Sequence, residues 1–333
     1  MILAPPFPRN HPRGMKTLCL LLLLSSTLRT TPLTAEDPAE ALIASAAALN
    51  DRGDFRAVIQ LLEPLVQSNT LDRQETGVAF DLLGTAYEFM GEYNRSRQSF
   101  EAALKVLADN PAQIRQYAAA LGNLGTLELE EGHADAAAHV DFKSLRLYQE
   151  LGDHAGVARE AGKVAQIALK NGRYRDAHKF LAEGFRESAF LQVPDTENLI
   201  FLYIIQTFVA AREIGWPGAL ENIQHAIDLS AGQRGSPYFM VANLYLVRGE
   251  VYDKLGEFEK ATGDLRYALE RVDGAVGRES PIYLRIQLAY AGVLRDSGSK
   301  QAAAALEQEA KGSLEELFRR QCVDCSVSVL SLR

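Results

Sequence analysis

A glycine that recurs near every fortieth residue constrains the fold of this chain more than any other feature. Seven such glycines each close a helix-like apolar segment, with spacings of 38, 41, 40, 43, 41 and 42 residues: Gly53, Gly91, Gly132, Gly172, Gly215, Gly256 and Gly298. Helices commonly end in a left-handed residue, a conformation in which a side chain clashes and glycine does not. A fixed period of this length is the signature of stacked repeats. The sequence therefore predicts an array of similar units.

The same apolar pattern surrounds the glycines. In the second unit, large apolar residues occur at helical spacing on both sides of the turn: Phe80, Leu83, Tyr87, Tyr93 and Phe100. The sixth unit has the matching set: Tyr245, Tyr252, Phe258 and Leu265. Spacing of three, four and seven residues marks one face of an amphipathic helix. Each unit is therefore predicted to be a helix, a tight turn and a second helix, which makes the fold all-α.

Small residues occur where the two helices of a unit should cross. In the first helices they are Gly84, Gly125, Ala165 and Gly249, and in the second helices Ala177, Ala261 and Ala303. This arrangement resembles the tetratricopeptide repeat, in its longer variety known from kinesin light chain and bacterial repeat proteins. The resemblance implies a right-handed α-α superhelix of about seven helix-turn-helix repeats over residues 36–320, a curved rod with an open inner wall. The third unit departs from the pattern, because Glu128 and Ala134 stand where aromatic residues are expected.

The first 35 residues have the character of an export signal. Met15 and Lys16 precede a seven-residue apolar run at 18–24, and a stretch of small residues ends at Ala35. A basic start, a short apolar core and a small residue at the end favour a cleaved signal peptide over residues 1–35, with Met15 favoured as the start. An apolar core this short does not span a bilayer. We therefore expect a periplasmic or secreted protein; the alternative is an unprocessed or misassigned N-terminus.

Charge argues against some classes of partner. The chain has 35 basic and 43 acidic residues, and its first 35 residues contain four bases and no acid. Cleavage would make the net charge more negative, from −8 to −12. An acidic chain repels phosphate backbones and anionic lipid. We expect no nucleic acid ligand and, after signal cleavage, no membrane span.

Two cysteines stand in a predicted C-terminal tail at residues 321–333. Cys322 and Cys325 form a single pair, which cannot supply four zinc ligands, and no histidine follows at finger spacing. In an oxidising compartment such a pair favours a small local disulfide. We predict no metal site.

Motifs for catalysis or cofactor binding are absent from the sequence. It contains no His-Glu-x-x-His, Gly-x-Ser-x-Gly or Gly-x-Gly-x-x-Gly pattern. We therefore predict no catalytic residue, no cofactor and no enzymatic activity on this chain. Arrays of this kind also accompany catalytic domains, so a partner enzyme encoded separately remains an alternative.

The resemblance to tetratricopeptide repeats implies a concave groove lined by the first helix of each unit. Carried over residue by residue, the groove positions are Asp81, Thr85 and Glu88 in the second unit, Asn123 and Thr126 in the third, Arg159, Lys163, Gln166 and Lys170 in the fourth, and Phe201, Ile204, Phe208 and Arg212 in the fifth. The resemblance implies that this groove binds a partner peptide or helix.

Part of this set is similar to the carboxylate clamp that some tetratricopeptide domains use on peptide C-termini. Arg159 and Lys163 are four residues apart on one helix face, and Asn123 belongs to the preceding first helix. The other half of the clamp is missing, because Asp81 and Thr85 occupy its places. The alternative is that Arg159 and Lys163 are solvated surface charges.

The fifth unit has an unusually apolar first helix, at residues 199–211. Helices that are apolar on all sides are usually buried on all sides. If the groove side is open instead, Phe201, Ile204 and Phe208 would form an apolar hot spot for a ligand.

Together these features favour an exported adaptor that holds a partner protein or peptide in the concave groove. The alternative is a regulatory module that senses a peptide. The partner and the oligomeric state are not defined by the sequence.

Overall fold

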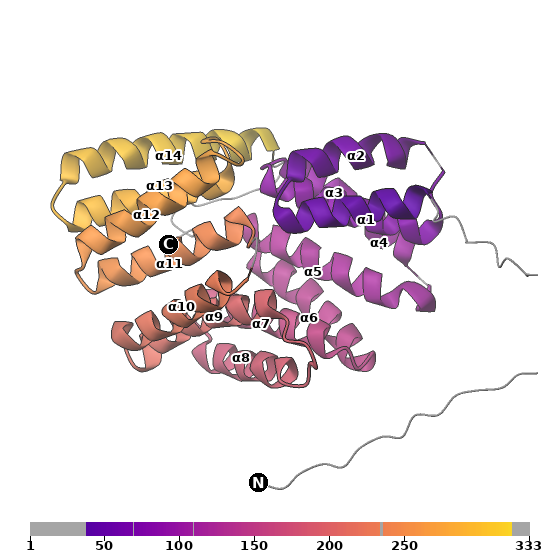
Figure 1. The fold of residues 1–333 in the computed structure, drawn as a ribbon, viewed down its shortest axis with the longest axis horizontal. Coiled ribbons are helices and arrows are strands. Elements are labelled where there is room, and N and C mark those ends of the chain that lie inside the picture. The colour runs from indigo at the N-terminus through magenta and orange to yellow at the C-terminus, as the bar shows by residue number, and fades with distance from the viewer. Residues whose placement is uncertain (1–37, 69, 109, 234–235, 322–333) are drawn as a thin grey trace, which may run out of the picture. The chain divides into compact units, whose positions relative to one another are not determined.

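Every regular element of the described residues is a helix. The computed structural model describes residues 38–68, 70–108, 110–233 and 236–321, and these contain no strand. Their α-helices (Figure 1) are α1 Pro38–Arg52, α2 Phe55–Gln67, α3 Arg73–Phe89, α4 Tyr93–Leu107, α5 Ile114–Glu130, α6 Ala134–Glu150, α7 His154–Lys170, α8 Tyr174–Ser188, α9 Thr196–Glu213, α10 Trp216–Ala231, α11 Tyr238–Lys254, α12 Phe258–Asp273, α13 Pro281–Asp296 and α14 Lys300–Gln321, with a 3-10 turn η1 at Pro111–Gln113. The predicted all-α fold is confirmed.

Consecutive helices pack as hairpins, from α1–α2 to α13–α14. All seven glycines of the sequence pattern have positive φ angles, between 69° and 96°. At Gly91 the turn is closed by two backbone hydrogen bonds: its N–H donates to the Glu88 carbonyl at 2.9 Å, and the Glu92 N–H donates to the Tyr87 carbonyl at 2.8 Å. Such bonds satisfy the last carbonyls of a helix. The predicted helix–turn–helix units are confirmed.

Three helices that open a hairpin, α3, α7 and α9, each begin after an aspartate whose side chain accepts a hydrogen bond from the backbone. Asp72 accepts from the Glu75 N–H at 2.8 Å, and the Glu75 carboxylate in turn accepts from the Asp72 N–H at 2.8 Å. Asp153 and Asp195 start α7 and α9 with similar bonds of 3.1 and 3.0 Å. These caps stabilise the helix starts by bonding N–H groups that have no partner inside the helix.

Glycines inside the helices allow the two members of a hairpin to approach closely. A Cβ atom on Gly84 would lie 2.5 Å from the ring of Phe100, and one on Gly249 would lie 2.9 Å from Leu265. Phe100 and Leu265 are both fully buried. The large side chain therefore occupies the space that the missing side chain leaves, as the sequence pattern implied.

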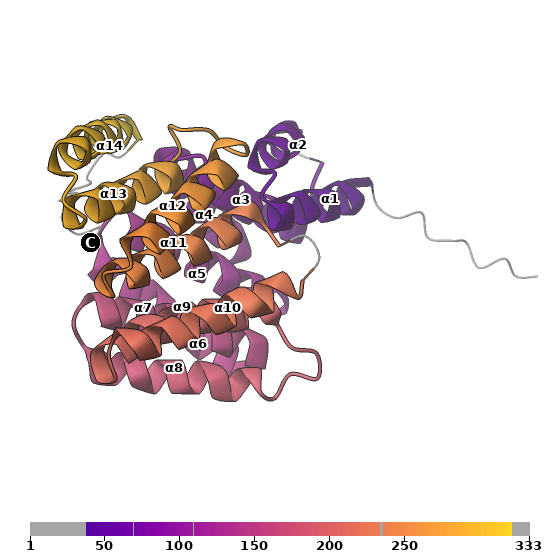
Figure 2. The same ribbon diagram turned by 60° about the vertical axis from the view of Figure 1, so that its left-hand side comes forward.

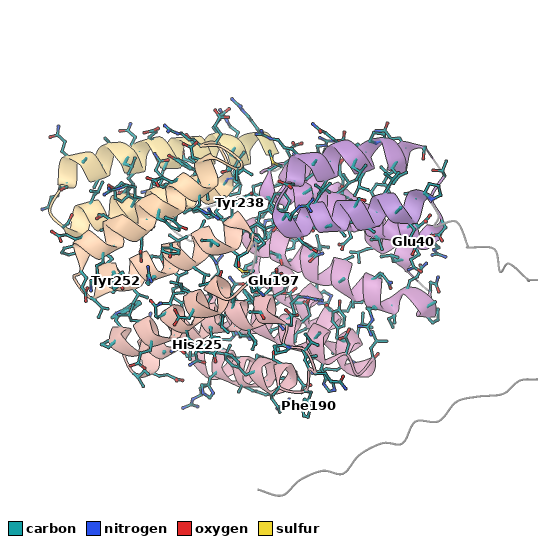
Figure 3. The ribbon with its side chains drawn as sticks, in the orientation of Figure 1. Glu40, Phe190, Glu197, His225, Tyr238 and Tyr252 are labelled. Carbon is teal, nitrogen blue, oxygen red and sulfur yellow. The ribbon has the colours of Figure 1, made fainter. Side chains whose placement is uncertain are left out.

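The last hairpins contact the first ones, although more than 100 residues separate them (Figures 1 and 2). The ring of Phe239 in α11 lies 5.9 Å from that of Phe55 in α2 and 4.8 Å from that of Phe89 in α3. Its neighbour Tyr238, labelled in Figure 3, contacts the turn at Gly53. These contacts correct the expectation of a rod with an open inner wall, because the inner wall is partly closed by helices distant in sequence.

Some sequence predictions fall outside the described residues. The signal peptide at 1–35 and the pair Cys322 and Cys325 both lie there, so export and the disulfide stay predictions. At the other boundary, α14 continues through Gln321. Among the helices that the structure describes, none combines the length and the apolar character needed to cross a bilayer.

Candidate functional site

Two predicted groove residues on neighbouring first helices bind each other. The side-chain amide of Asn123 on α5 lies 3.0 and 3.1 Å from the two carboxylate oxygens of Asp81 on α3. Thr85 and Thr126 donate their hydroxyls to backbone carbonyls one turn back in their own helices, each at 3.2 Å. In this structure Asn123 is therefore engaged by an acid of the same chain.

The predicted basic pair on α7 is also engaged within the protein. Lys163 donates from Nζ to the carbonyl of Gly122 at 2.9 Å, and only 14% of its side chain is exposed. Arg159 donates to the hydroxyl of Tyr148 at 2.8 Å and to the carboxylate of Glu160 at 3.1 Å. Lys163 is therefore not a solvated surface charge, whereas 41% of the Arg159 side chain is exposed although it has partners in the protein.

Two buried acids lie beside this basic pair and were not predicted. Glu160 on α7 is fully buried, and Asp141 on α6 is 1% exposed. A Cβ atom on Gly122 would lie 2.5 Å from Glu160, and one on Gly125 would overlap the carboxylate of Asp141. The sequence held a signal for this arrangement, because two glycines in α5 leave room for acidic side chains as well as for apolar ones.

Burial and nearby cations set the protonation of the inner acids. Burial raises the pKa of Asp81 to about 6, although the bond from Asn123 and the charge of Lys163 oppose the rise. Burial also raises the pKa of Asp141 to about 7, again against Lys163. The pKa of Glu88 rises to about 8 for the same reason. Lys163 is therefore the shared counter-charge of several acids.

The other predicted polar residues lie on α7 and α9. Lys170 donates to the Leu129 carbonyl at 3.3 Å, and burial lowers its pKa. Arg212 is exposed, and its guanidinium lies 5.1 Å from the ring centre of Tyr174. Gln166 is half-buried in α7. These three residues do not form a common site with Arg159 and Lys163 through any contact between described side chains.

The apolar residues predicted on α9 separate into two environments. Ile204 is 7% exposed and belongs to the buried core with α10 and α11. Phe201 lies against Gly162 of α7, where a Cβ atom would be 2.8 Å from its ring. Phe208 is half-buried and lines a cavity. Most of this helix is thus buried, and Phe208 alone of the three predicted residues reaches the cavity.

The cavity of about 370 Å³ lies between α9, α10, α11, α13 and α14. Its apolar lining includes Phe208, Trp216, Leu246, Leu288 and Ala289. A volume of this size is typical of ligand sites, which are mostly apolar with a few polar groups. The first helices of the last two hairpins, which the groove predicted from sequence did not include, supply much of this lining.

Charged side chains also line the cavity, and most of them are paired with each other. Lys254 lies 2.8 Å from Asp253, and Arg295 lies 2.9 Å from Glu307. Glu250, on the same face of α11 as Leu246, has a pKa that burial raises to about 7. The cavity therefore combines an apolar wall with a paired ionic border and one acid that titrates near neutrality.

No protein-family model matches the sequence, and a similarity to a known protein covers only a short stretch. The human SH3 domain and tetratricopeptide repeat-containing protein 2 is 33% identical over 98 residues, which are 29% of this chain and 8% of that protein. The fold is decided by the stacked helix hairpins, with their left-handed glycine turns and small residues at the helix crossings. The chain has the tetratricopeptide-repeat fold.

Solved structures share this tetratricopeptide-repeat fold. A Rap protein complexed with competence and sporulation factor has a TM-score of 0.62 at 11% identity, covering 84% of this chain and 77% of that one. NprR in complex with its cognate peptide NprX has a TM-score of 0.56 at 15% identity, with coverage of 85% and 80%. Aspartyl phosphate phosphatase F from Bacillus subtilis has a TM-score of 0.60 at 14% identity, with coverage of 87% and 72%. At these identities the likeness is one of fold.

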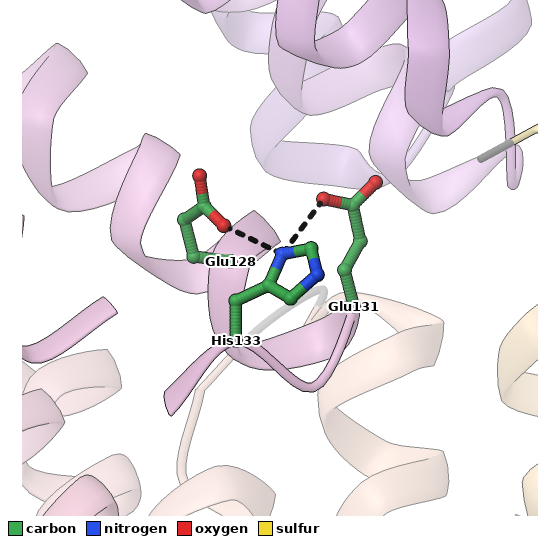
Figure 4. A group of neighbouring side chains, drawn as sticks. All are labelled: Glu128, Glu131 and His133. Atoms are coloured by element: carbon green, nitrogen blue, oxygen red, sulfur yellow. Dashed lines mark hydrogen bonds and ion pairs between the residues drawn. The ribbon is translucent and has the colours of Figure 1, made fainter. Parts of the chain in front are cut away.

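The third tetratricopeptide repeat contains a group of possible metal ligands (Figure 4). Glu128, Glu131 and His133 bring ligand atoms within 4.8 Å of one another, and His133 Nδ1 lies 2.9 Å from Glu128. Arg97 of α4 already pairs with both carboxylates, at 2.6 Å to Glu128 and in a closer contact to Glu131. A metal ion would have to displace that guanidinium. The group is therefore an ion-pair network, and it explains why this repeat has Glu128 in place of an aromatic residue.

Proposed function

We propose that this chain is a protein-interaction module that binds a segment of a partner protein or a peptide in the cavity between α9, α10, α11, α13 and α14. The observation that carries the proposal is the cavity itself, with its volume of about 370 Å³ and its apolar wall. Apolar anchors of a partner gain most of their binding energy by filling pockets of this kind. This proposal places the binding site in the last three repeats, whereas the groove predicted from sequence lay in the second to fifth repeats.

The polar residues of the second to fourth repeats support this choice. Asn123 is bound to Asp81, Lys163 to the Gly122 carbonyl and Arg159 to Tyr148. A ligand carboxylate in a clamp at this place would have to break these internal bonds first, at a cost to affinity. The cavity needs no such rearrangement, since its apolar lining is already formed.

A regulatory module that senses a peptide is the second candidate. Two proteins with a similar fold carry peptide or factor ligands in their structures, namely the Rap protein with competence and sporulation factor and NprR with NprX. This candidate uses the same cavity and differs in the response that binding would trigger. One similar structure is named a phosphatase, yet our proposal for this chain is binding without catalysis.

Photo-crosslinking from the cavity tests the proposal. A benzoylphenylalanine at Leu288, which lines the cavity, should crosslink a defined set of partners in the source cells. The same group at Ala304, an exposed position on α14, is the control for random encounter. Equal crosslinking from both positions would contradict the cavity as the binding place.

We also propose that the protein is exported after cleavage following Ala35. The basic, apolar and small-residue segments before that position support this. Mass spectrometry of the N-terminal peptide of the mature protein tests it, with Glu36 expected as the first residue. An N-terminus at Met1 or Met15 in the mature protein would contradict export.

A further inference from the structure

Glu250 is the acid of the cavity that lacks a partner. It makes no hydrogen bond or ion pair with any other residue that the structure describes, although its side chain is half-buried and lines the cavity. Lys254, one turn further along α11, attracts it only at longer range. Lys254 is itself paired with Asp253 at 2.8 Å and lies 3.8 Å from Asp296. Glu250 therefore lines the cavity without a hydrogen-bond or ion-pair partner among the described residues.

The other charges at the cavity are arranged differently. Each of its cations has a carboxylate partner: Arg285 with Glu130, Arg295 with Glu307, Lys311 with Glu307, and Lys254 with Asp253. An anionic ligand would have to compete with these acids for a cation. A cationic ligand would meet Glu250 without displacing any group. Charge complementarity thus favours a positive ligand.

We propose that Glu250 recognises a lysine or arginine side chain of the bound peptide, while a neighbouring large apolar side chain of that peptide packs against Phe208, Trp216 and Leu288. This inference rests on the proposed function and names the chemistry of its ligand. A carboxylate removed from bulk water is costly to leave unpaired, and a charge-assisted hydrogen bond from an ammonium or guanidinium group offsets that cost. The stem of a lysine or arginine also suits an apolar wall.

A metal ion is a poorer occupant of this position. A stable site needs several ligand atoms close together. The group of three possible ligands that the structure describes is Glu128, Glu131 and His133, and Glu250 does not belong to it. One carboxylate beside an apolar wall suits an organic cation better.

Two variants separate the wall from the charge. Gly292 in α13 lines the cavity, and the nearest neighbour of a Cβ atom there would be the Arg295 guanidinium at an ordinary 3.7 Å. Gly292→Leu therefore adds an apolar side chain at the cavity wall without a clash at its Cβ atom. Gly263→Leu is its control, because Gly263 lies in the exposed part of α12 with open space around it. Glu250→Gln removes the charge and keeps the shape, with the exposed Glu221→Gln as control. Thermal unfolding verifies that all four variants fold.

The experiment is selection from a phage-displayed random dodecapeptide library on the full chain without residues 1–35 and on each variant. We expect the parent protein and both controls to enrich peptides with a lysine or arginine beside a large apolar residue, and Gly292→Leu to lose them. Glu250→Gln should bind these peptides roughly tenfold more weakly, as expected for one charge-assisted bond. Replacing the basic residue of a peptide with norleucine should weaken binding to the parent protein by the same factor. It should not weaken binding to Glu250→Gln any further.

Two results would overturn the inference in different ways. Peptides that need the open cavity but lack a basic residue, or that bind Glu250→Gln within about twofold of the parent, would refute recognition by Glu250 and leave the proposed function in place. If no peptide distinguishes the parent protein from Gly292→Leu, the cavity is not the binding place, and the proposed function falls together with the inference.

Discussion

Arg285 of α13 and Glu130 of α5 form a two-pronged ion pair although 155 residues separate them in sequence. One guanidinium nitrogen donates to the carboxylate at 2.9 Å, and the second nitrogen lies in closer contact. About a quarter of each side chain is exposed, at 28% and 27%. The pair joins the seventh repeat to the third across the inner side of the array. Long-range contacts of this kind go beyond the neighbour-to-neighbour stacking of a repeat protein.

The ion pair should contribute measurably to stability. Arg285→Gln and Glu130→Gln should each lower the free energy of unfolding by about 1–3 kcal/mol, because each leaves a partly buried charge without its partner. The double variant should lose less than the sum of the two, with a coupling energy of about 1–2 kcal/mol. Urea unfolding of the four proteins measures this. Strictly additive losses would mean that the Arg285–Glu130 ion pair adds nothing to stability.

Close packing at the third repeat should make replacement of Gly125 destabilising. Gly125→Ala would press a methyl group into the carboxylate of Asp141, which is buried and cannot move into solvent. We expect a loss of about 1–3 kcal/mol in the free energy of unfolding, as for other overpacked cores. Gly263→Ala on exposed α12 is the matched control and should gain about 0.5–1 kcal/mol from helix propensity. Similar changes in the free energy of unfolding for Gly125→Ala and Gly263→Ala would contradict close packing between Gly125 and Asp141.

Stability should depend on pH through Glu88. Burial raises the pKa of this residue to about 8 in the folded state, while Lys163 and Arg285 oppose the rise and Glu131 and Asp81 add to it. The folded state therefore holds a proton that the unfolded state has lost above about 4.5. The stabilisation is present at low pH and is lost as the pH rises from about 4.5 to 8.

Glu88→Gln removes this dependence, because glutamine does not ionise. Its Tm should exceed that of the parent by a few degrees at pH 8.5, and the difference should vanish near pH 4.5. Differential scanning calorimetry across this range measures both values. If Glu88→Gln and the parent differ in Tm by the same amount at every pH, Glu88 does not titrate between pH 4.5 and 8.5.

Lys163 should stabilise the fold as well as carry charge in the predicted groove. Its ammonium group lowers the pKa values of Asp81, Glu88 and Asp141, which burial raises. Lys163→Met removes the shared cation and should destabilise the protein at pH 8 by roughly 2 kcal/mol. The loss should be smaller at pH 5, because the acids are then protonated in the folded state and need no cation.

Lys105→Met is the control for this substitution, since Lys105 is exposed on α4. It should unfold at the same denaturant concentration as the parent at both pH values. If Lys163→Met also unfolds at the same denaturant concentration as the parent at both pH values, Lys163 does not stabilise the fold. The comparison matters for binding studies, because charge reversal at Lys163 would disturb the fold together with any ligand.

The sequence alone determined the repeat. The left-handed turns at Gly91 and the six related positions favour glycine because a side chain would clash there. At Gly84 the missing side chain leaves the space that Phe100 fills. Both requirements are local to one hairpin of about 40 residues, so they were visible as a period in the sequence. The all-α fold and its helix–turn–helix units follow from them.

The tertiary structure decided what the inner side of the array offers to a ligand. The pairing of Asn123 with Asp81 and that of Arg285 with Glu130 depend on how successive repeats are rotated against each other. That rotation is the sum of many small side-chain contacts, and no single repeat encodes it. The same summation leaves Glu250 unpaired beside an apolar wall, although its sequence neighbours Asp253 and Lys254 are paired. Helix periodicity places a residue on a face, but only packing between distant repeats determines what that face meets.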